Sequence, residues 1–168
     1  MNRYTVAVLV RNQFGVLNRV TSMFRRRQFN ISALSVSETE SVELSRITVT
    51  FEGEETNKQQ LINQLYKLPD VCSIKEFTNS DSVSCELLLI KMANDPATRD
   101  EIRTAADAFR ASIVDYSKGS IVFQLADDTR RIDDFIDLMR DYTILEICRT
   151  GIISLEKGSS TIRKVTNL

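Results

Sequence analysis

Residues 4–20, YTVAVLVRNQFGVLNRV, decide how this chain begins to fold. The first seven of these residues are typical of a β-strand, and the residues after Gly15 have the spacing of an amphipathic helix. Because apolar residues occupy both alternating faces of the strand, we predict that it lies at the centre of a sheet. A tight turn at Gly15 therefore joins a buried strand to a helix, and the first N–H groups of a helix have no acceptor inside it.

This predicted helix start is a candidate anion site. The carboxylate of a small zwitterion, such as an amino acid, would accept hydrogen bonds from the N–H groups after Gly15, at Val16 and Leu17. Such an interaction is worth up to about 2 kcal/mol when it is partly buried. The side chain of Asn12 could hold a polar group of the same ligand.

Selectivity of this site for an aliphatic ligand would come from neighbouring apolar residues such as Ile31 and Val36. Each extra carbon group in such a pocket contributes only about 1–3 kcal/mol, so discrimination among aliphatic amino acids is expected to be modest. Asn12 and Asn30 also suit loop ends, because asparagine tolerates left-handed geometry. The alternative interpretation is that these asparagines and Gly15 serve only the turns.

Composition narrows the function classes. The chain has 168 residues, of which 42% are hydrophobic, with 22 basic and 23 acidic residues and a net charge of −1. A nucleic-acid binder acting through bulk charge is disfavoured by this balance. The chain has no histidine, which is both the commonest general base and the commonest metal ligand. No other part of the sequence resembles a reactive centre.

The three cysteines, Cys72, Cys85 and Cys148, lie far apart in apolar, strand-like contexts. They are predicted to be buried reduced thiols, since a zinc site needs paired spacing. We find no secretory signal at the N-terminus and no apolar run of about 18 residues. A soluble cytoplasmic protein without metal is therefore expected.

The first half of the sequence predicts the order strand, helix, strand, strand, helix, strand. The first helix should bury Val16, Leu17, Val20, Met23 and Phe24, and the second is expected to begin with a capping box at 56–59 (TNKQ). The expected strands are 4–11, 31–38, 44–52 and 71–77, and the first helix is 16–28.

After a short polar linker at 79–82, the same order of elements repeats. Asp95 and Pro96 are expected to be the N-cap and first residue of a helix that runs to Phe109, and Asp127 or Asp128 should cap the next helix. The expected strands of this half are 83–92, 113–116, 121–125 and 144–148.

These patterns predict an α+β protein with two tandem ferredoxin-like βαββαβ domains, at 1–78 and 83–158, followed by a frayed tail at 159–168. Each domain should be a four-stranded antiparallel sheet with two helices on one face. Strand one and the run Leu87-Leu88-Leu89-Ile90 are nevertheless apolar on both sides. This surplus predicts that the open faces or edges meet another copy or another protein.

Several motifs resemble those of one family. They are NQFGVLNRV (12–20), FNI (29–31) and LSRIT (44–48) in the first half, and RDEI (99–102), FRASIVD (109–115) and EICRTG (146–151) in the second. The chain resembles the regulatory small subunit of acetohydroxyacid synthase, also called acetolactate synthase, over residues 2–158. The first half is similar to an ACT domain, and the second half resembles the C-terminal domain of the small subunit.

The resemblance implies a non-catalytic regulatory subunit, which raises the activity of a catalytic large subunit and confers feedback inhibition by valine or another branched-chain amino acid. It places thiamine diphosphate, magnesium and FAD in the large subunit and no cofactor in this chain. It also implies a homodimer through ACT domains, with the effector where two such domains pair. Asn12, Gly15, Asn30 and Ile31 match the family's valine-contacting positions, whereas Val36 is included only as a neighbouring apolar residue.

Three other functions compete with this one. An RNA-recognition module shares the topology but needs aromatic residues on its central strands, where this chain has valine, isoleucine and leucine. A small acylphosphatase-like hydrolase would need a phosphate-cradling loop with an arginine, for which Arg11 is the only hint, and a general base. An ACT-type amino-acid sensor that regulates a different enzyme is the third, since fold alone does not specify the client.

Overall fold

The computed structural model describes residues 2–78 and 80–163, and the chain forms two compact units. The first unit combines Met1–Ser84 with Ile152–Leu168, and the second is Cys85–Gly151. The chain therefore leaves the first unit and later returns to it. The expected domain boundaries placed 152–158 in the second domain, whereas in the structure these residues group with the first unit.

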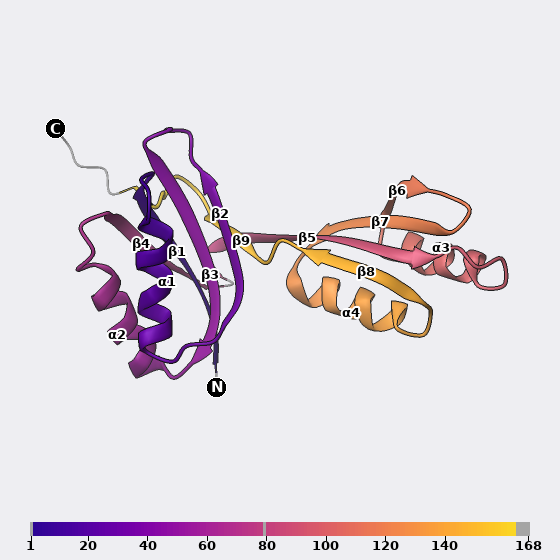
Figure 1. Ribbon diagram of the computed structural model, residues 1–168, viewed down its shortest axis with the longest axis horizontal. Helices are drawn as coiled ribbons and strands as arrows, with labels where there is room; N and C mark the ends of the chain where they lie inside the picture. The colour runs from indigo at the N-terminus through magenta and orange to yellow at the C-terminus, as the bar shows by residue number, and fades with distance from the viewer. Residues whose placement is uncertain (1, 79, 164–168) are drawn as a thin grey trace. The chain divides into compact units, whose positions relative to one another are not determined.

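The first unit is an antiparallel sheet of order β2-β3-β1-β4 with two helices on one side (Figure 1). The central position of β1 and the order of elements confirm the sequence prediction. The elements are β1 (Asn2–Arg11), α1 (Val16–Arg26), β2 (Ile31–Glu38), β3 (Leu44–Gly53), α2 (Glu55–Leu65) and β4 (Val71–Phe77).

Helix α1 is held against the sheet by the buried side chains of Val16, Val20 and Phe24. The Phe24 ring meets Phe51 of β3 edge-on at 5.4 Å, a favoured aromatic geometry. Leu17 was expected in the core but is 41% exposed, because it lies outside the stripe of residues that faces the sheet. This exposure leaves an apolar side chain at the start of α1.

The end of α1 and the start of α2 differ in detail from the prediction. The left-handed residue after α1 is Gln28, with φ 58°, and not Asn30. The N-cap of α2 is Glu54, whose side chain makes no cap hydrogen bond, so the expected capping box at 56–59 is wrong. The helix begins at Glu55, and Lys58 in its first turns forms ion pairs with Glu55 and Glu76.

The second unit repeats the arrangement as a sheet of order β6-β7-β5-β8 with two helices, α3 and α4. Its buried cluster joins Leu88, Ile90 and Met92 of β5 to the apolar faces of the helices. The two α+β, ferredoxin-like units are thus confirmed. The elements are β5 (Ser82–Ala93), α3 (Arg99–Ala108), β6 (Ser112–Tyr116), β7 (Ser120–Asp127), α4 (Thr129–Met139) and β8 (Ile144–Arg149). The strand that follows them, β9 (Ile153–Glu156), belongs to the first unit.

The helix starts of the second unit agree only in part with the prediction. Asp128 caps α4, since its Oδ1 accepts the N–H of Arg131 at 2.9 Å. Helix α3 begins at Arg99 with Thr98 as N-cap, so the expected start at Asp95 and Pro96 is wrong. Asp95 instead closes a separate turn, in which its carboxylate accepts the N–H of Ala97.

The chain's own C-terminal segment covers the open face of the first sheet. Ala7 and Leu9, on that face of β1, are only 0% and 3% exposed. From the neighbouring strands, Lys75 forms an ion pair with Glu156 at 2.7 Å, and Arg46 donates to the carbonyl of Ser154. The surplus of apolar residues on β1 was expected to meet another molecule. It is buried here by residues that follow the second unit in the sequence.

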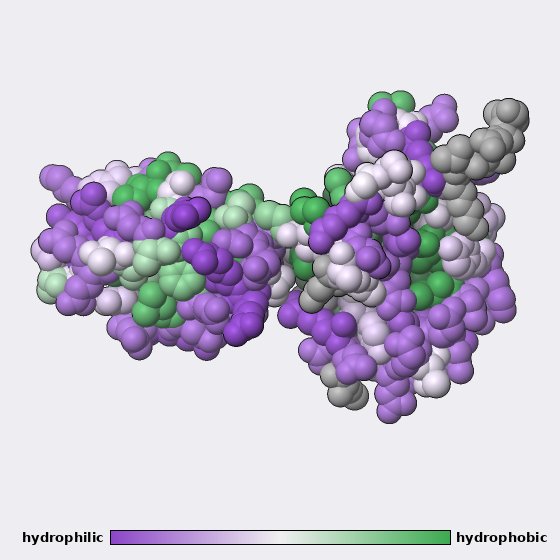
Figure 2. Space-filling view, turned by 180° about the vertical axis from the view of Figure 1, so that it is seen from behind, coloured by the Kyte–Doolittle hydropathy of each residue, from purple (hydrophilic) through white to green (hydrophobic). Residues whose placement is uncertain are grey.

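The open face of the second sheet carries exposed apolar side chains, and Figure 2 shows such surface among the hydrophilic residues of this unit. Leu89 is 36% exposed on this face of β5. Cys72 and Cys148 are exposed and Cys85 is half-buried, so the prediction of three buried thiols is wrong. The reason is topological, because Cys72 and Cys148 lie on the edge strands β4 and β8.

Candidate functional site

The loop between β1 and α1 has the geometry that an anion site needs. Gly15 is the N-cap of α1 and adopts the left-handed conformation, with φ 78° and ψ −3°. Residues with a Cβ take this conformation less readily than glycine, so glycine is the favoured residue at this turn. No acidic residue occupies the first turn of α1. The positive end of the helix dipole is therefore not neutralised by the helix itself.

The hydrogen bonds of this loop identify which N–H groups remain available. The N–H of Val16 donates to the carbonyl of Gln13 at 3.3 Å, and the side chain of Val16 lies in the core. Within residues 2–78 and 80–163, no acceptor is found for the N–H groups of Gly15, Leu17 and Asn18. Of the two expected donors, Leu17 is thus open, whereas Val16 is already engaged.

Asn12 fixes the loop in place. Its Nδ2 donates to Oε1 of Glu38 at 3.1 Å and to the carbonyl of Val42 at 2.9 Å, and its own N–H donates to the carbonyl of Glu43. Both side-chain N–H donors are therefore used inside the protein. The Oδ1 atom remains as an acceptor, which suits an ammonium group better than a carboxylate.

Arg19 is a residue of this region that sequence reasoning missed. Its Nη1 lies 3.8 Å from the position that a Cβ on Gly15 would occupy, and its Nη2 forms an ion pair with Asp70 at 2.7 Å. The signal was present in the sequence, since residues four apart share a helix face. The guanidinium of Arg19 thus lies beside the open N–H groups of the helix start, with part of its charge balanced by Asp70.

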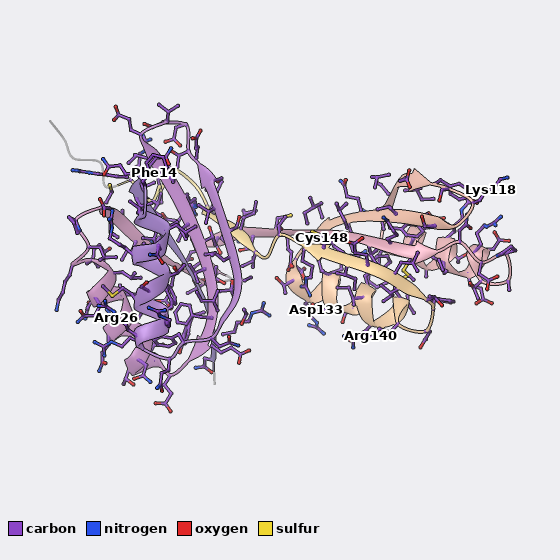
Figure 3. All side chains as sticks on the ribbon, in the orientation of Figure 1. Phe14, Arg26, Lys118, Asp133, Arg140 and Cys148 are labelled. Carbon is purple, nitrogen blue, oxygen red and sulfur yellow. The ribbon has the colours of Figure 1, made fainter. Side chains whose placement is uncertain are left out.

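Asn30 and Ile31 lie at the opposite end of α1 from Gly15. The helix has 11 residues, which corresponds to a length of about 16 Å. Figure 3 shows the same separation, with Phe14 at one end of α1 and Arg26 near the other. Within one chain, the structure therefore does not bring Asn30 and Ile31 together with Gly15.

Strand β2 is an edge of the sheet and carries an exposed apolar row. Leu34 and Val36 pair with Val49 and Ile47 of β3, whose side chains are in the core beneath the helices. Paired residues point to the same side of a sheet, so Leu34 and Val36 face the helix side beside α1. They are nonetheless 38% and 42% exposed. Leu34 and Val36 therefore form an apolar row that remains partly exposed at the edge of the sheet.

Two ion-pair clusters elsewhere have structural explanations. Burial alone would lower the pKa of Lys58, but hydrogen bonds to Glu55 and Glu76 outweigh it and raise that pKa. In the second unit, a bidentate hydrogen bond to the buried Glu86 is the largest cause that raises the pKa of Arg149. Among the described residues, no group of three or more His, Cys, Asp or Glu side chains is arranged to hold a metal ion.

Two family models match the sequence. One, described as an AHAS small subunit-like ACT domain, matches residues 6–73, and the other, described as the small subunit of acetolactate synthase, matches residues 85–158. A probable acetolactate synthase small subunit from Archaeoglobus fulgidus is 44% identical over 157 residues, which cover 94% of this chain and 98% of the relative. The acetolactate synthase small subunit of Bacillus subtilis is 42% identical, over 92% of this chain and 90% of that protein.

Comparison with solved structures points to the same family. The crystal structure of an acetolactate synthase small subunit from Thermotoga maritima superposes with a TM-score of 0.86 and 30% sequence identity. The match covers 95% of this chain and 100% of that one. Each helix in the described part of the chain is too short or too polar to span a bilayer.

Proposed function

The chain belongs to the family of acetolactate synthase small subunits, and from this premise we propose that it raises the activity of a catalytic large subunit and makes that subunit sensitive to feedback by valine or another branched-chain amino acid. The relatives matched over nearly their whole length carry the small-subunit name. Thiamine diphosphate, magnesium and FAD would be held by the large subunit, and this chain would contribute no cofactor.

The observation that carries the effector site is the open helix start at Gly15. Its N–H groups without acceptors, at Gly15, Leu17 and Asn18, can receive a carboxylate, and the guanidinium of Arg19 stands close by. The ammonium of the same amino acid can donate to Oδ1 of Asn12. One small zwitterion thus finds complementary groups for both of its charges.

The other half of the site would come from a second copy of the chain. Register pairs Glu38 with Ser45 and Ile31 with Phe51, so Glu38 and Ile31 mark opposite ends of the edge strand β2. If two such strands pair antiparallel about a two-fold axis, the Ile31 end of one chain lies beside the Glu38 end of the other. Glu38 is hydrogen-bonded to Asn12, so this pairing would bring Asn30 and Ile31 of one chain to the Asn12–Gly15 loop of the other.

Such a dimer would also cover the exposed apolar row. Leu34 and Val36 lie on the edge strand and are more exposed than their partners on β3. An aliphatic effector side chain would contact Ile31 and Val36 in the same interface. Because the ligand would bridge two chains, its binding would favour one dimer arrangement over others, and the large subunit would respond through different contacts with the two arrangements.

The decisive experiment mixes the protein with a cognate large subunit and measures acetolactate formation with and without valine. We expect the chain to raise the rate and valine to lower it again. We expect no turnover of pyruvate by the chain alone. If the large subunit formed acetolactate at the same rate with and without this chain, the proposed role would be contradicted.

A second candidate is an ACT-type amino-acid sensor that regulates a different enzyme, and effector binding by the isolated protein separates the two. Valine that binds only the folded state raises the melting temperature by mass action. A shift with millimolar valine, leucine or isoleucine, together with no effect on acetolactate formation, would favour the second candidate. No shift with any of the three would count against an effector site in this chain.

A further inference from the structure

A cavity lies within the first unit, on the sheet face that the helices do not cover. It has a volume of about 440 Å³, which is in the range of small-molecule sites. Strand ends and the β2–β3 turn form one wall, and the C-terminal segment forms the other. The lining residues are Leu9, Ser37, Glu38, Thr39, Glu40, Arg46, Phe77, Leu155, Glu156, Gly158, Ser160, Thr161, Ile162 and Arg163.

Arg46 is one of the two arginines that line this cavity. It pairs with Leu9 across the sheet and is half-buried, with its guanidinium 5.5 Å from the centroid of the Phe77 ring. A guanidinium has five N–H donors. Among the described residues, Arg46 donates one hydrogen bond, to the carbonyl of Ser154, and forms no direct ion pair.

The carboxylates near this guanidinium are engaged elsewhere. Glu156 forms an ion pair with Lys75 at 2.7 Å, and Glu40 forms one with Arg163 at 2.7 Å. Burial lowers the pKa of Arg46 by more than the fields of Glu156 and Glu40 raise it. Most N–H donors of Arg46 therefore have no acceptor among the described residues, although the carboxylates of Glu38, Glu40 and Glu156 also line the cavity.

The remaining walls indicate the kind of ligand that could accept hydrogen bonds from these donors. Leu9, Phe77 and Ile162 give an apolar surface beside the guanidinium, and Glu38 and Glu40 lie at the β2–β3 turn. We propose that this cavity is a second ligand site of the chain, which binds a small aliphatic carboxylate through Arg46. It is distinct from the site at Gly15, because Arg46 projects from the opposite face of the sheet.

The position of Glu38 links this cavity to the Gly15 loop. Glu38 lines the cavity and also accepts the hydrogen bond from Asn12. An occupant that shifts Glu38 would change the restraint on the loop at the helix start. By linkage, a ligand in either site would then alter the affinity of the other by the same factor.

Three matched compounds test the carboxylate requirement. L-valine and 2-oxoisovalerate share a carboxylate and a branched carbon chain, whereas isobutylamine is valine without its carboxylate. In ¹H–¹⁵N spectra of the full chain, we expect one or both carboxylates to shift the amides of 37–40 and 155–162, and isobutylamine to leave them unchanged. If only one of the two carboxylates binds, the comparison shows whether the ammonium group of valine favours or hinders binding. Either result supports the site.

Variants separate the two sites. In Gly15→Asp, the shifts at 155–162 should persist, since that substitution lies on the other face. In Arg46→Gln, the affinity measured from those shifts should fall about 10- to 100-fold, as for loss of a charged hydrogen bond, whereas Arg46→Lys should retain part of it. Arg103→Gln, the same change at an exposed residue of α3, is the control and should bind like the parent chain.

The proposal would be overturned if millimolar valine and 2-oxoisovalerate both left 37–40 and 155–162 unshifted in the parent chain, or if isobutylamine shifted them equally. The measurement on the parent chain does not depend on whether Arg46→Gln keeps the C-terminal segment in place. It also does not depend on regulation of a large subunit, so the two proposals can fail separately.

Discussion

Helices α1 and α3 occupy the same place in the two units, yet their starts have opposite electrostatic character. Helix α1 begins at a left-handed glycine, with no acidic residue in its first turn. Helix α3 carries Asp100 and Glu101 in its first turn. Negative side chains there satisfy the helix dipole and repel an anion. The same fold thus occurs twice, and of these two helix starts the one in the first unit is open to a carboxylate.

The two units also differ in how far the open faces of their sheets are covered. In the first unit, Ala7 and Leu9 are buried, and the C-terminal segment lies on the same face of the sheet. In the second, Leu89 stays 36% exposed at the corresponding position of the central strand. Four experiments test these contrasts between the units.

The greatest change in stability is expected at Leu9, on the covered face. Leu9→Ala should lower the free energy of unfolding by about 2–5 kcal/mol, because it removes a buried side chain and enlarges the cavity beneath the C-terminal segment. The matched change Leu89→Ala should cost less than about 1 kcal/mol. Urea denaturation measures both. Equal losses would mean that the two faces are not differently covered.

Substitution of Gly15 should have the next greatest effect. Gly15→Asp places a carboxylate beside the open N–H groups and should weaken valine binding by at least about 30-fold, equivalent to about 2 kcal/mol, while the protein still folds. Gly15→Asn keeps the shape without the charge and should bind valine more tightly than Gly15→Asp.

The control for this charge effect is in the other unit. Gly119 is surrounded by open space, with no heavy atom within 4 Å of the point where a Cβ would lie, so Gly119→Asp should be tolerated and leave valine binding unchanged. Isothermal titration calorimetry compares the three variants. Unaltered feedback in Gly15→Asp, in the reconstituted enzyme, would reject the placement of the effector.

An intermediate effect is expected at the capped start of α4. Asp128→Ala removes the hydrogen bond to the N–H of Arg131 and should destabilise that helix by about 0.5–2 kcal/mol. Glu54→Ala is the matched control, because Glu54 is the N-cap of α2 but makes no cap hydrogen bond. Native-state hydrogen exchange of the helix amides reports each change. A larger loss for Glu54→Ala would contradict the assignment of caps.

The least pronounced but most diagnostic effect is expected for Asn18→Asp, which gives α1 the acidic first turn of α3. The helix should gain about 0.3–1 kcal/mol through its dipole. Valine affinity should fall about 2- to 5-fold, since the new carboxylate competes for the same positive end. Stability from urea denaturation and affinity from calorimetry should thus move in opposite directions. A parallel change in both would refute a carboxylate site at this helix.

Much of the fold followed from local patterns. The apolar run at 4–10 predicted β1 as a central strand, and the spacing of Val16, Val20 and Phe24 predicted the buried face of α1. The misplaced starts of α2 and α3 show where such reasoning fails. Helix α2 begins at Glu55 without a side-chain cap, and Asp95 closes a local turn instead of capping α3.

The candidate site was predicted less completely. Gly15 and Asn12 were found from a turn signal, because backbone conformation leaves a mark in residue choice. The engaged N–H of Val16 and the position of Arg19 beside Gly15 depend on distances that no sequence pattern encodes. The separation of Asn30 and Ile31 from Gly15 also became plain only from the length of α1.

Local sequence was enough to specify the two βαββαβ repeats, the glycine that starts α1 and the family to which the chain belongs, because alternation, helical spacing and turn residues are properties of neighbouring positions. Only the three-dimensional fold shows that residues after Gly151 return to cover the first sheet, and that Arg46 lies half-buried in a cavity beneath them. Burial and charge pairing depend on which distant segments meet in space, and the apolar surplus of β1 could be satisfied equally well by another molecule or by the chain's own end.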